Sequence, residues 1–264
     1  MNTFRYNIGV VKIGTEVVTN RDTGNIERNV IEHLVDQIAD IRSEVNHVIV
    51  VTSGAVALGR ADMRGAKDFS IPDEAAMSPE DLLDLKRLYA SVGQPILHRT
   101  YADALRIHGL RAPQVLLKKP DELRNIFGGA LNLRSLVPII NENDAIASDQ
   151  FFSDNDDLAQ HVAEIVRADF VCFLTSVNGL RRDMHDPNSI IHAVAPDDEM
   201  WRTFVEETTS KNGKGGMPSK CERAQSLARQ GIWAHIADGR QEDVLQRILG
   251  GEAIGTRFLA AEKS

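Results

Sequence analysis

The sequence predicts an α/β protein, a three-layer α/β/α sandwich with a mostly parallel central sheet. Short apolar runs at 8–13, 47–52 and 170–175 have the length and composition of buried strands, and the first is rich in β-branched residues. The first two are followed by glycine-bearing turns and then by segments that carry apolar residues at helical spacing. Strands that alternate with helices in this way are typical of parallel βαβ units.

The N-terminal half of the chain continues this alternation. Residues 27–42 carry a broad apolar face at helical spacing, and another helix is expected after the turn Ser53-Gly54-Ala55. Residues 60–77 are polar and rich in Gly, Asp and Ala, which predicts an irregular surface excursion. A long helix should follow over 78–108, with a break near Gly93-Gln94-Pro95.

The C-terminal half adds strands and helices of the same kinds, without a repeat or a long linker. We expect, in order, a strand at 113–117, a helix at 121–134, a strand from Leu136, a helix after Asp154, the 170–175 strand, a small β excursion returning at 190–194, helices at 196–207 and 218–230, a strand at 232–237, a helix at 241–249 and an edge strand at 255–259. These elements fit a single domain.

Composition and charge exclude some classes of partner. The 264 residues carry a formal net charge of −8, which argues against nucleic acid or a membrane surface as the main partner. No apolar run reaches membrane-spanning length and no signal segment precedes the first strand, so we expect a cytoplasmic protein. Cys172 and Cys221 lie in apolar or helical contexts and are expected in the core, not in a disulfide or a zinc site.

Two polar clusters follow the apolar run that ends at Ile140. The first is Asn141-Glu142-Asn143-Asp144, and the second, Asp154-Asn155-Asp156-Asp157, opens an amphipathic segment. Open α/β sheets bind ligands at the carboxyl edge of their strands, and amides with carboxylates suit a zwitterionic or metal-bound ligand. A solvated turn and a helix cap would use the same residue types, so both interpretations stay open.

Three glycine-bearing segments coincide with lysines or hydroxyl groups at expected strand ends or helix starts. They are Lys12-Ile13-Gly14-Thr15, Thr52-Ser53-Gly54-Ala55 and the segment 213–220. Glycine lets backbone amides approach an anion, and Lys12 and Lys220 could hold a phosphate in transfer. Neither a Walker A loop nor a G-x-G-x-x-G motif is present, and each segment alone could be an ordinary turn.

With Ser91-Val92-Gly93-Gln94, these segments and clusters resemble the amino-acid kinase family in the family's order and over nearly the whole chain. The resemblance is closest to members that phosphorylate the side-chain carboxylate of L-glutamate to L-glutamyl 5-phosphate, the first step of proline biosynthesis. It implies ATP and Mg²⁺, an acceptor-binding lobe at about 1–167, a nucleotide-binding lobe at about 168–264, and a homodimer or homotetramer. The C-terminal PUA domain that many such members carry is expected to be absent.

The resemblance also implies a role for individual residues. Lys12 and Lys220 would hold the phosphoryl group and Asp156 would orient both lysines. The acceptor would be bound by Ser53, Gly54, Ala55, Asn141, Asp144 and Asn155. ATP would be bound by Lys12, Gly14, Thr175, Ser176, Lys214, Gly215, Gly216, Met217, Pro218, Ser219 and Lys220. No residue is assigned to a metal, because Mg²⁺ would be held mostly by phosphate oxygens and water.

The chain departs from the family's usual residues at four positions. Glu16 stands in place of a small hydroxyl residue, Ser176 in place of Asp, Lys214 in place of Thr, and Pro218 in place of Ser or Thr. Glu16 and Lys214 could form a compensating charge pair. Two alternatives therefore stay open: a kinase of the family with a different small carboxylate acceptor, and a non-catalytic regulator that binds a nucleotide or an amino acid. Retention of both lysines and of Asp156 speaks against the regulator.

Overall fold

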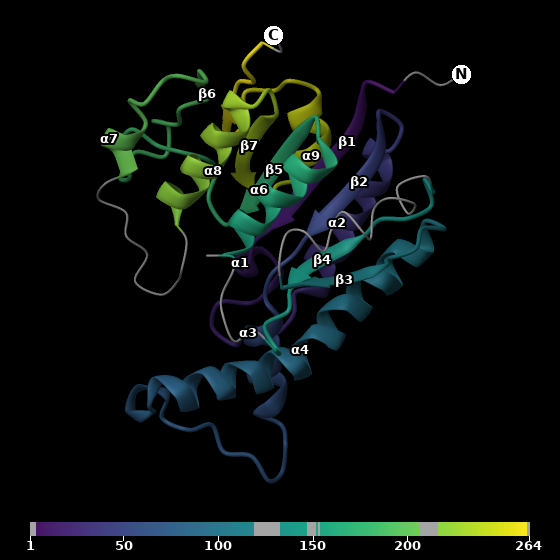
Figure 1. Cartoon of the computed structure of the whole chain (residues 1–264), viewed down its shortest axis with the longest axis vertical. Helices are drawn as coiled ribbons and strands as arrows, with labels where there is room; N and C mark the ends of the chain where they lie inside the picture. The colour runs from purple at the N-terminus through teal and green to yellow at the C-terminus, as the bar shows by residue number, and fades with distance from the viewer. Residues whose placement is uncertain (1–3, 119–132, 147–151, 153, 206–215, 263–264) are drawn as a thin grey trace.

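A computed structural model describes residues 4–118, 133–146, 152, 154–205 and 216–262. Its centre is an eight-stranded sheet with helices on both faces (Figure 1). The strands are β1 (Tyr6–Ile13), β2 (Val45–Val51), β3 (Gln114–Leu117), β4 (Ile139–Glu142), β5 (Phe170–Thr175), β6 (Ala193–Val194), β7 (Trp233–Asp238) and β8 (Thr256–Phe258). The three-layer α/β/α architecture predicted from the sequence is confirmed.

The strand order is β3-β4-β2-β1-β5-β7-β8-β6, and every pair is parallel except β7 with β8. The first strand of the chain therefore lies inside the sheet, between β2 and β5. The prediction that residues 255–259 form an edge strand is wrong, because β8 is covered by β6 on its outer side. The pairing partner of a strand depends on tertiary contacts that its own residues do not reveal.

The helices are α1 (Thr15–Val18), α2 (Arg28–Ile41), α3 (Ala55–Met63), α4 (Pro79–Ile107), α6 (Asn155–Val166), α7 (Arg202–Val205), α8 (Met217–Arg229) and α9 (Val244–Leu249), with a 3-10 turn at Glu74–Ala76. Alternate residues of β1 enter two separate cores. Val11 packs with apolar residues of α2, α4 and α9, and Val10 packs with those of α6 and α8. This alternation follows from the period of two along a strand.

The long helix α4 is continuous, so the predicted break near Gly93-Gln94-Pro95 is wrong. Pro95 removes one backbone donor, but the buried face of the helix runs on through Leu97 and Tyr101. Glycines bring α3 and α4 together: a Cβ on Gly93 would overlap the carbonyl oxygen of Ala55, and one on Gly59 would overlap that of Tyr89. The N-terminal half of α4 and the segment before it project beyond the sheet, at the bottom of Figure 1.

Other boundaries differ from the sequence prediction by a few residues. β4 begins at Ile139 and not at Leu136, so Asn141 and Glu142 end the strand and do not follow it. Of the residues expected to be helical at 196–207, those described form a short helix only at Arg202–Val205. The expected helix at 121–134 lies almost wholly outside the described residues. In the part of the chain that the structure describes, no helix has the length and apolarity needed to cross a membrane, and both cysteines are buried and unbonded to each other.

Candidate active site

Three charged side chains from three elements meet at the carboxyl edge of the central strands. The Nζ atom of Lys12 lies 2.5 Å from Oδ1 of Asp156, and Nζ of Lys220 lies 3.0 Å from Oδ2 of the same carboxylate. The side chain of Asp156 is 3% exposed, and those of the lysines are 6% and 13% exposed. One carboxylate therefore bridges two buried ammonium groups, which is the arrangement predicted for these residues.

The local structure explains how these side chains come together. Lys12 is the penultimate residue of β1, so its position is set by the sheet. Asp156 lies in the first turn of α6, where the Asp154 side chain caps the helix by accepting from the backbone N–H groups of Asp156 and Asp157. Asp154 also accepts from Ser219 Oγ, in the first turn of α8, at 3.1 Å. The capping interpretation of the second polar cluster is confirmed for Asp154, while Asp156 is free to contact the lysines.

The charge state of Asp156 follows from two opposing effects. Burial alone raises the pKa of this carboxyl, but the two ammonium groups of Lys12 and Lys220 outweigh burial and the net pKa is lowered. Asp156 is therefore ionised near neutral pH. The cluster carries one positive charge in excess, and the N-termini of α6 and α8 add partial positive charge. An anion such as a phosphate group is the ligand that this arrangement favours.

The turn after β2 lies beside this cluster and contains the predicted acceptor residues Ser53, Gly54 and Ala55. Gly54 has a φ of +109°, a backbone conformation that a side chain would oppose, and it precedes the first residue of α3. Ser53 is buried, and the neighbouring Thr52 Oγ1 lies 3.2 Å from the hydroxyl of Tyr101. The backbone N–H groups that begin α3 have no i−4 partner within the helix and are suited to bind a carboxylate.

The other predicted acceptor residues lie at the end of β4 and the start of α6. Asn141 is 1% exposed. Its Nδ2 donates to Oε1 of Gln94 at 2.8 Å and its Oδ1 accepts from the backbone N–H of Glu142. Asp144 lies in the turn that follows β4, and Oδ1 of Asn155 is buried without a hydrogen-bond partner among the described residues. The fold thus brings both polar clusters to the same edge of the sheet, as predicted.

The residues predicted to bind the nucleotide lie in two neighbouring segments. Relative to the lysine cluster, these segments are on the side away from the predicted acceptor residues. Gly14 donates its N–H to the carbonyl of Leu174, which places the first glycine turn next to Thr175 and Ser176 at the end of β5. Gly216 caps α8, and Met217, Pro218 and Ser219 form the helix's first residues before Lys220. Lys214 and Gly215 lie outside the described residues.

Glu16 has partners that the sequence did not reveal. Its Oε2 accepts from Ser176 Oγ at 2.5 Å and from Nη2 of Arg21 at 2.8 Å. These two hydrogen bonds lower the pKa of Glu16, and the charge of Lys220 adds a smaller effect in the same direction. Glu16 and Ser176, two of the residues that depart from the family pattern, are therefore joined by a hydrogen bond from the hydroxyl group of Ser176 to the carboxylate of Glu16. The proposed pairing of Glu16 with Lys214 involves a residue outside those described and stays a prediction.

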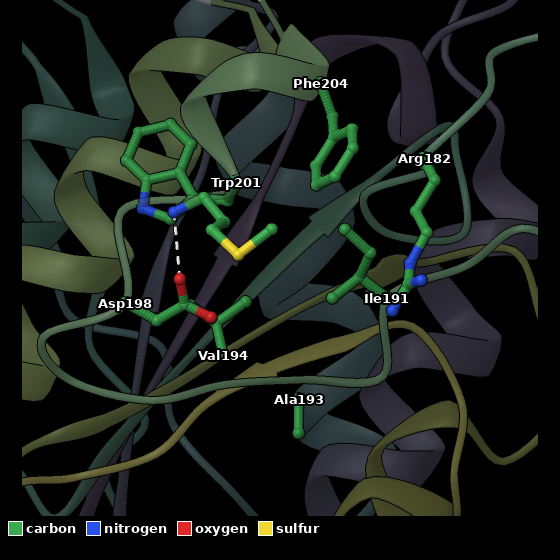
Figure 2. Close-up of a pocket in the computed structure, with 8 residues that line it drawn as sticks. Arg182, Ile191, Ala193, Val194, Asp198, Trp201 and Phe204 are labelled. Carbon is green, nitrogen blue, oxygen red and sulfur yellow. Dashed lines mark hydrogen bonds between the residues drawn. The ribbon is translucent and has the colours of Figure 1, made fainter.

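A separate pocket lies in the C-terminal half of the chain. It has a volume of about 140 Å³ and is lined by Arg182, Ile191, Ala193, Val194, Asp198, Met200, Trp201 and Phe204. Figure 2 shows the apolar side chains facing this space, while Asp198 accepts from the backbone N–H of Met200. Trp201 donates to Gln225 on α8. None of the residues predicted from the sequence to bind ligands lines this pocket, so it is distinct from the lysine–aspartate cluster.

The described residues offer no ready-made metal centre. Within the described ranges no group of three or more His, Cys, Asp or Glu side chains could hold a metal ion, and both oxygens of Asp156 face ammonium groups. This donor set fits an ion that arrives with the ligand's own oxygens better than one held by the protein alone.

Comparison with known proteins decides the family. The model of the amino acid kinase family matches residues 7–238 of the chain. The chain belongs to the amino acid kinase family. The match includes β1, which carries Lys12, and α8, which carries Lys220.

Individual relatives and solved structures agree with this family. The chain is 34% identical over 260 residues to a glutamate 5-kinase of Chlorobaculum tepidum, covering 95% of this chain and 68% of the relative. It is 37% identical to one of Symbiobacterium thermophilum, covering 94% of each chain. By structure it resembles the UMP kinase of Ureaplasma parvum, with a TM-score of 0.66, 15% identity and coverage of 97% and 100%. It also resembles the isopentenyl phosphate kinase of T. acidophilum, with a TM-score of 0.65, 16% identity and coverage of 96% and 100%.

Proposed function

We propose that the protein transfers the γ-phosphoryl group of ATP to the side-chain carboxylate of L-glutamate, forming L-glutamyl 5-phosphate and ADP. This would be the first step of proline biosynthesis. The relatives named glutamate 5-kinase support the substrate, and one structural observation carries the chemistry. That observation is the pair of buried ammonium groups of Lys12 and Lys220 on one carboxylate, Asp156.

The reaction needs charge compensation more than proton transfer. An oxygen of the glutamate side chain attacks the γ-phosphorus, a new O–P bond forms, and the bond from the γ-phosphorus to the β–γ bridging oxygen breaks, so that its electron pair leaves on ADP. A glutamate side chain has a pKa of about 4.3 and is already ionised at neutral pH, so no general base has to remove a proton. The obstacle is the repulsion between two anions, which fixed positive charges reduce.

The lysine cluster is suited to this task. Lys12 would contact the phosphoryl group from β1, and Lys220 would contact it from α8. Asp156 keeps both ammonium groups oriented before the substrates bind, so that little reorganisation is needed during transfer. Ser53, Gly54, Ala55, Asn141, Asp144 and Asn155 would surround the acceptor. Gly14, Thr175, Ser176 and the residues 214–220 would surround the nucleotide.

Mg²⁺ fits this site as a companion of ATP. Phosphate oxygens and water would hold the ion, since the described side chains form no metal-binding group of their own. When bound, Mg²⁺ neutralises charge on the β- and γ-phosphates.

An acyl-phosphate trap tests the proposal. The protein is incubated with ATP, Mg²⁺, hydroxylamine and single amino acids, and the hydroxamate that forms is measured by its colour with ferric iron. We expect hydroxamate with L-glutamate and much less with L-aspartate or L-glutamine. Hydroxamate with another acid alone would reject glutamate as the acceptor. ATP binding without turnover on any acid would favour the non-catalytic regulator.

The organisation of the chain is also part of the proposal. We propose an acceptor-binding lobe at about 1–167 and a nucleotide-binding lobe at about 168–264, a homodimer or homotetramer, and a location in the cytoplasm. Light scattering after size-exclusion chromatography would measure the oligomeric state, and a monomer would contradict it.

A further inference from the structure

Gln94 is a buried residue of α4, and only one of the two polar atoms of its side chain has a hydrogen-bond partner among the described residues. The residue is 8% exposed. Its Oε1 accepts from Nδ2 of Asn141 at 2.8 Å, while its Nε2 has no hydrogen-bond partner among the described residues. A buried donor without a partner costs free energy, and native proteins seldom keep one without a reason.

The unsatisfied nitrogen alone would not indicate a ligand, because Gln37 shows the same pattern elsewhere. Gln37 is 1% exposed, its Oε1 accepts from the N–H of Leu245, and its Nε2 also has no described partner. However, Gln37 lies on α2 where it packs against α9, on a different part of the molecule. The position of Gln94 is what distinguishes the two.

Gln94 lies between two segments proposed to hold the acceptor, the turn that leads from β2 into α3 and the end of β4. The preceding residue, Gly93, is so close to the first turn of α3 that a Cβ would overlap the carbonyl oxygen of Ala55. On its other side Gln94 contacts Asn141 at the end of β4. The N–H of Thr52 donates to the carbonyl of Ile140, so the turn after β2 and the end of β4 are themselves neighbours.

The sheet register indicates which end of the acceptor faces Gln94. Lys12 is in register with Val51, and Val51 with Ile140, the residue before Asn141. Two strand spacings, about 10 Å, therefore separate Lys12 from this part of β4. If the reacting side-chain carboxylate of an amino acid lies near the lysines, the α-carboxylate and α-ammonium groups of the same molecule would point towards β4 and Gln94.

An amide nitrogen is an uncharged donor that suits a carboxylate oxygen. The buried Oδ1 of Asn155, which also has no described partner, is an acceptor that suits an ammonium group. We propose that Gln94 is a specificity-determining residue of the acceptor site, whose Nε2 donates to the α-carboxylate of the amino acid while Oε1 remains bonded to Asn141. This inference rests on the proposed phosphorylation of an amino acid at the same site.

Two substitutions test the role of Gln94. Gln94→Leu removes both polar atoms at similar size. Gln94→Glu keeps an oxygen for Asn141 but replaces the donor by a negative charge. We expect both to raise the KM for L-glutamate by about 10- to 100-fold, the range for a lost hydrogen bond to a charged group. The KM for ATP should stay within about twofold. Gln37→Leu is the matched control and should leave both KM values unchanged.

A second acceptor substrate distinguishes recognition of the α-carboxylate by Gln94 from a general loss of packing around this residue. L-isoglutamine keeps the side-chain carboxylate but has a carboxamide in place of the α-carboxylate, so it can donate to a glutamate at position 94. We expect Gln94→Glu to lower the ratio of kcat/KM for L-glutamate to that for L-isoglutamine at least about tenfold relative to the unsubstituted protein. A loss of packing alone would reduce both values together and leave the ratio unchanged.

The possible failures are distinguishable. If the unsubstituted protein forms no hydroxamate with any amino acid, the proposed function fails. If it phosphorylates L-glutamate but uses L-isoglutamine equally well, or if Gln94→Glu leaves the ratio unchanged, the role of Gln94 is wrong while the function stands. The comparison of the two acceptors on the unsubstituted protein needs no variant to fold.

Discussion

Replacement of Asp156 by asparagine tests the central feature of the active site. The substitution preserves size and shape but removes the negative charge between the Nζ atoms of Lys12 and Lys220. Asparagine can still accept one hydrogen bond, but its nitrogen faces the second ammonium group donor to donor. We expect a protein that is both less stable and much less active.

The size of the stability change follows from burial. All three side chains are at least 87% shielded from solvent, since the most exposed, that of Lys220, is 13% exposed. Removing one partner of a buried ion pair leaves an uncompensated charge and costs about 3–5 kcal/mol. The same substitution at Asp197, whose side chain is 97% exposed and lies 3.9 Å from Arg229, should change stability by less than about 0.5 kcal/mol.

The loss of stability caused by Asp156→Asn should depend on pH in a definite direction. Because the pKa of Asp156 is lowered in the folded protein, its ionised form stabilises the fold above the unfolded pKa of about 3.9, and the contribution is lost as pH falls through the folded value. We therefore expect urea unfolding of the unsubstituted protein and of Asp156→Asn, measured between pH 7 and pH 3, to give free energies of unfolding that differ most near neutrality. The difference should shrink in acid. A difference below about 1 kcal/mol at pH 7, with turnover within tenfold of the unsubstituted protein, would refute the assignment of Asp156.

Three further predictions concern the same region. Lys220→Ala should reduce kcat about 100-fold or more without loss of helical circular dichroism, and retained turnover would show that the phosphoryl group is held elsewhere. Ser176→Asp should place a second carboxylate against Glu16 and raise the KM for ATP, whereas the double exchange Glu16→Ser with Ser176→Asp should recover much of the loss; a double-mutant cycle with no coupling would contradict this pairing. Gly93→Ala should lower the free energy of unfolding by about 1–3 kcal/mol, because the added methyl group has to displace the backbone of α3, and unchanged urea unfolding would show that the two helices separate easily.

The sequence predicts best those parts of the molecule that local patterns determine. The strand expected at 170–175 occurs as β5 at those bounds, because a short apolar run between turns leaves little choice. The break expected at Pro95 does not occur, because burial of α4 against α3 outweighs the loss of one backbone hydrogen bond. Local pattern alone could not weigh these two effects.

Contacts between distant segments were the least predictable part of the site. The resemblance to the family implies that Asp156 orients Lys12 and Lys220, and the fold supplies the distances from its carboxylate to the two ammonium groups. In the sequence Glu16 and Ser176 are two separate departures from the family pattern, because their hydrogen bond joins residues 160 positions apart. The sequence presents Gln94 only as part of a motif, because its hydrogen-bond partner Asn141 lies 47 residues further along the chain.

The central place of β1 in the sheet limits how the protein can close around its substrates. β1 is hydrogen-bonded to β2 on one side and to β5 on the other, so the two proposed lobes share one continuous sheet and no linker separates them. A hinge between the lobes would have to break the ladder between β1 and β5, which is buried on both faces. Closure is therefore expected to come from the helices and loops at the carboxyl edge, while the strands that carry Lys12 and Thr175 stay fixed as a frame.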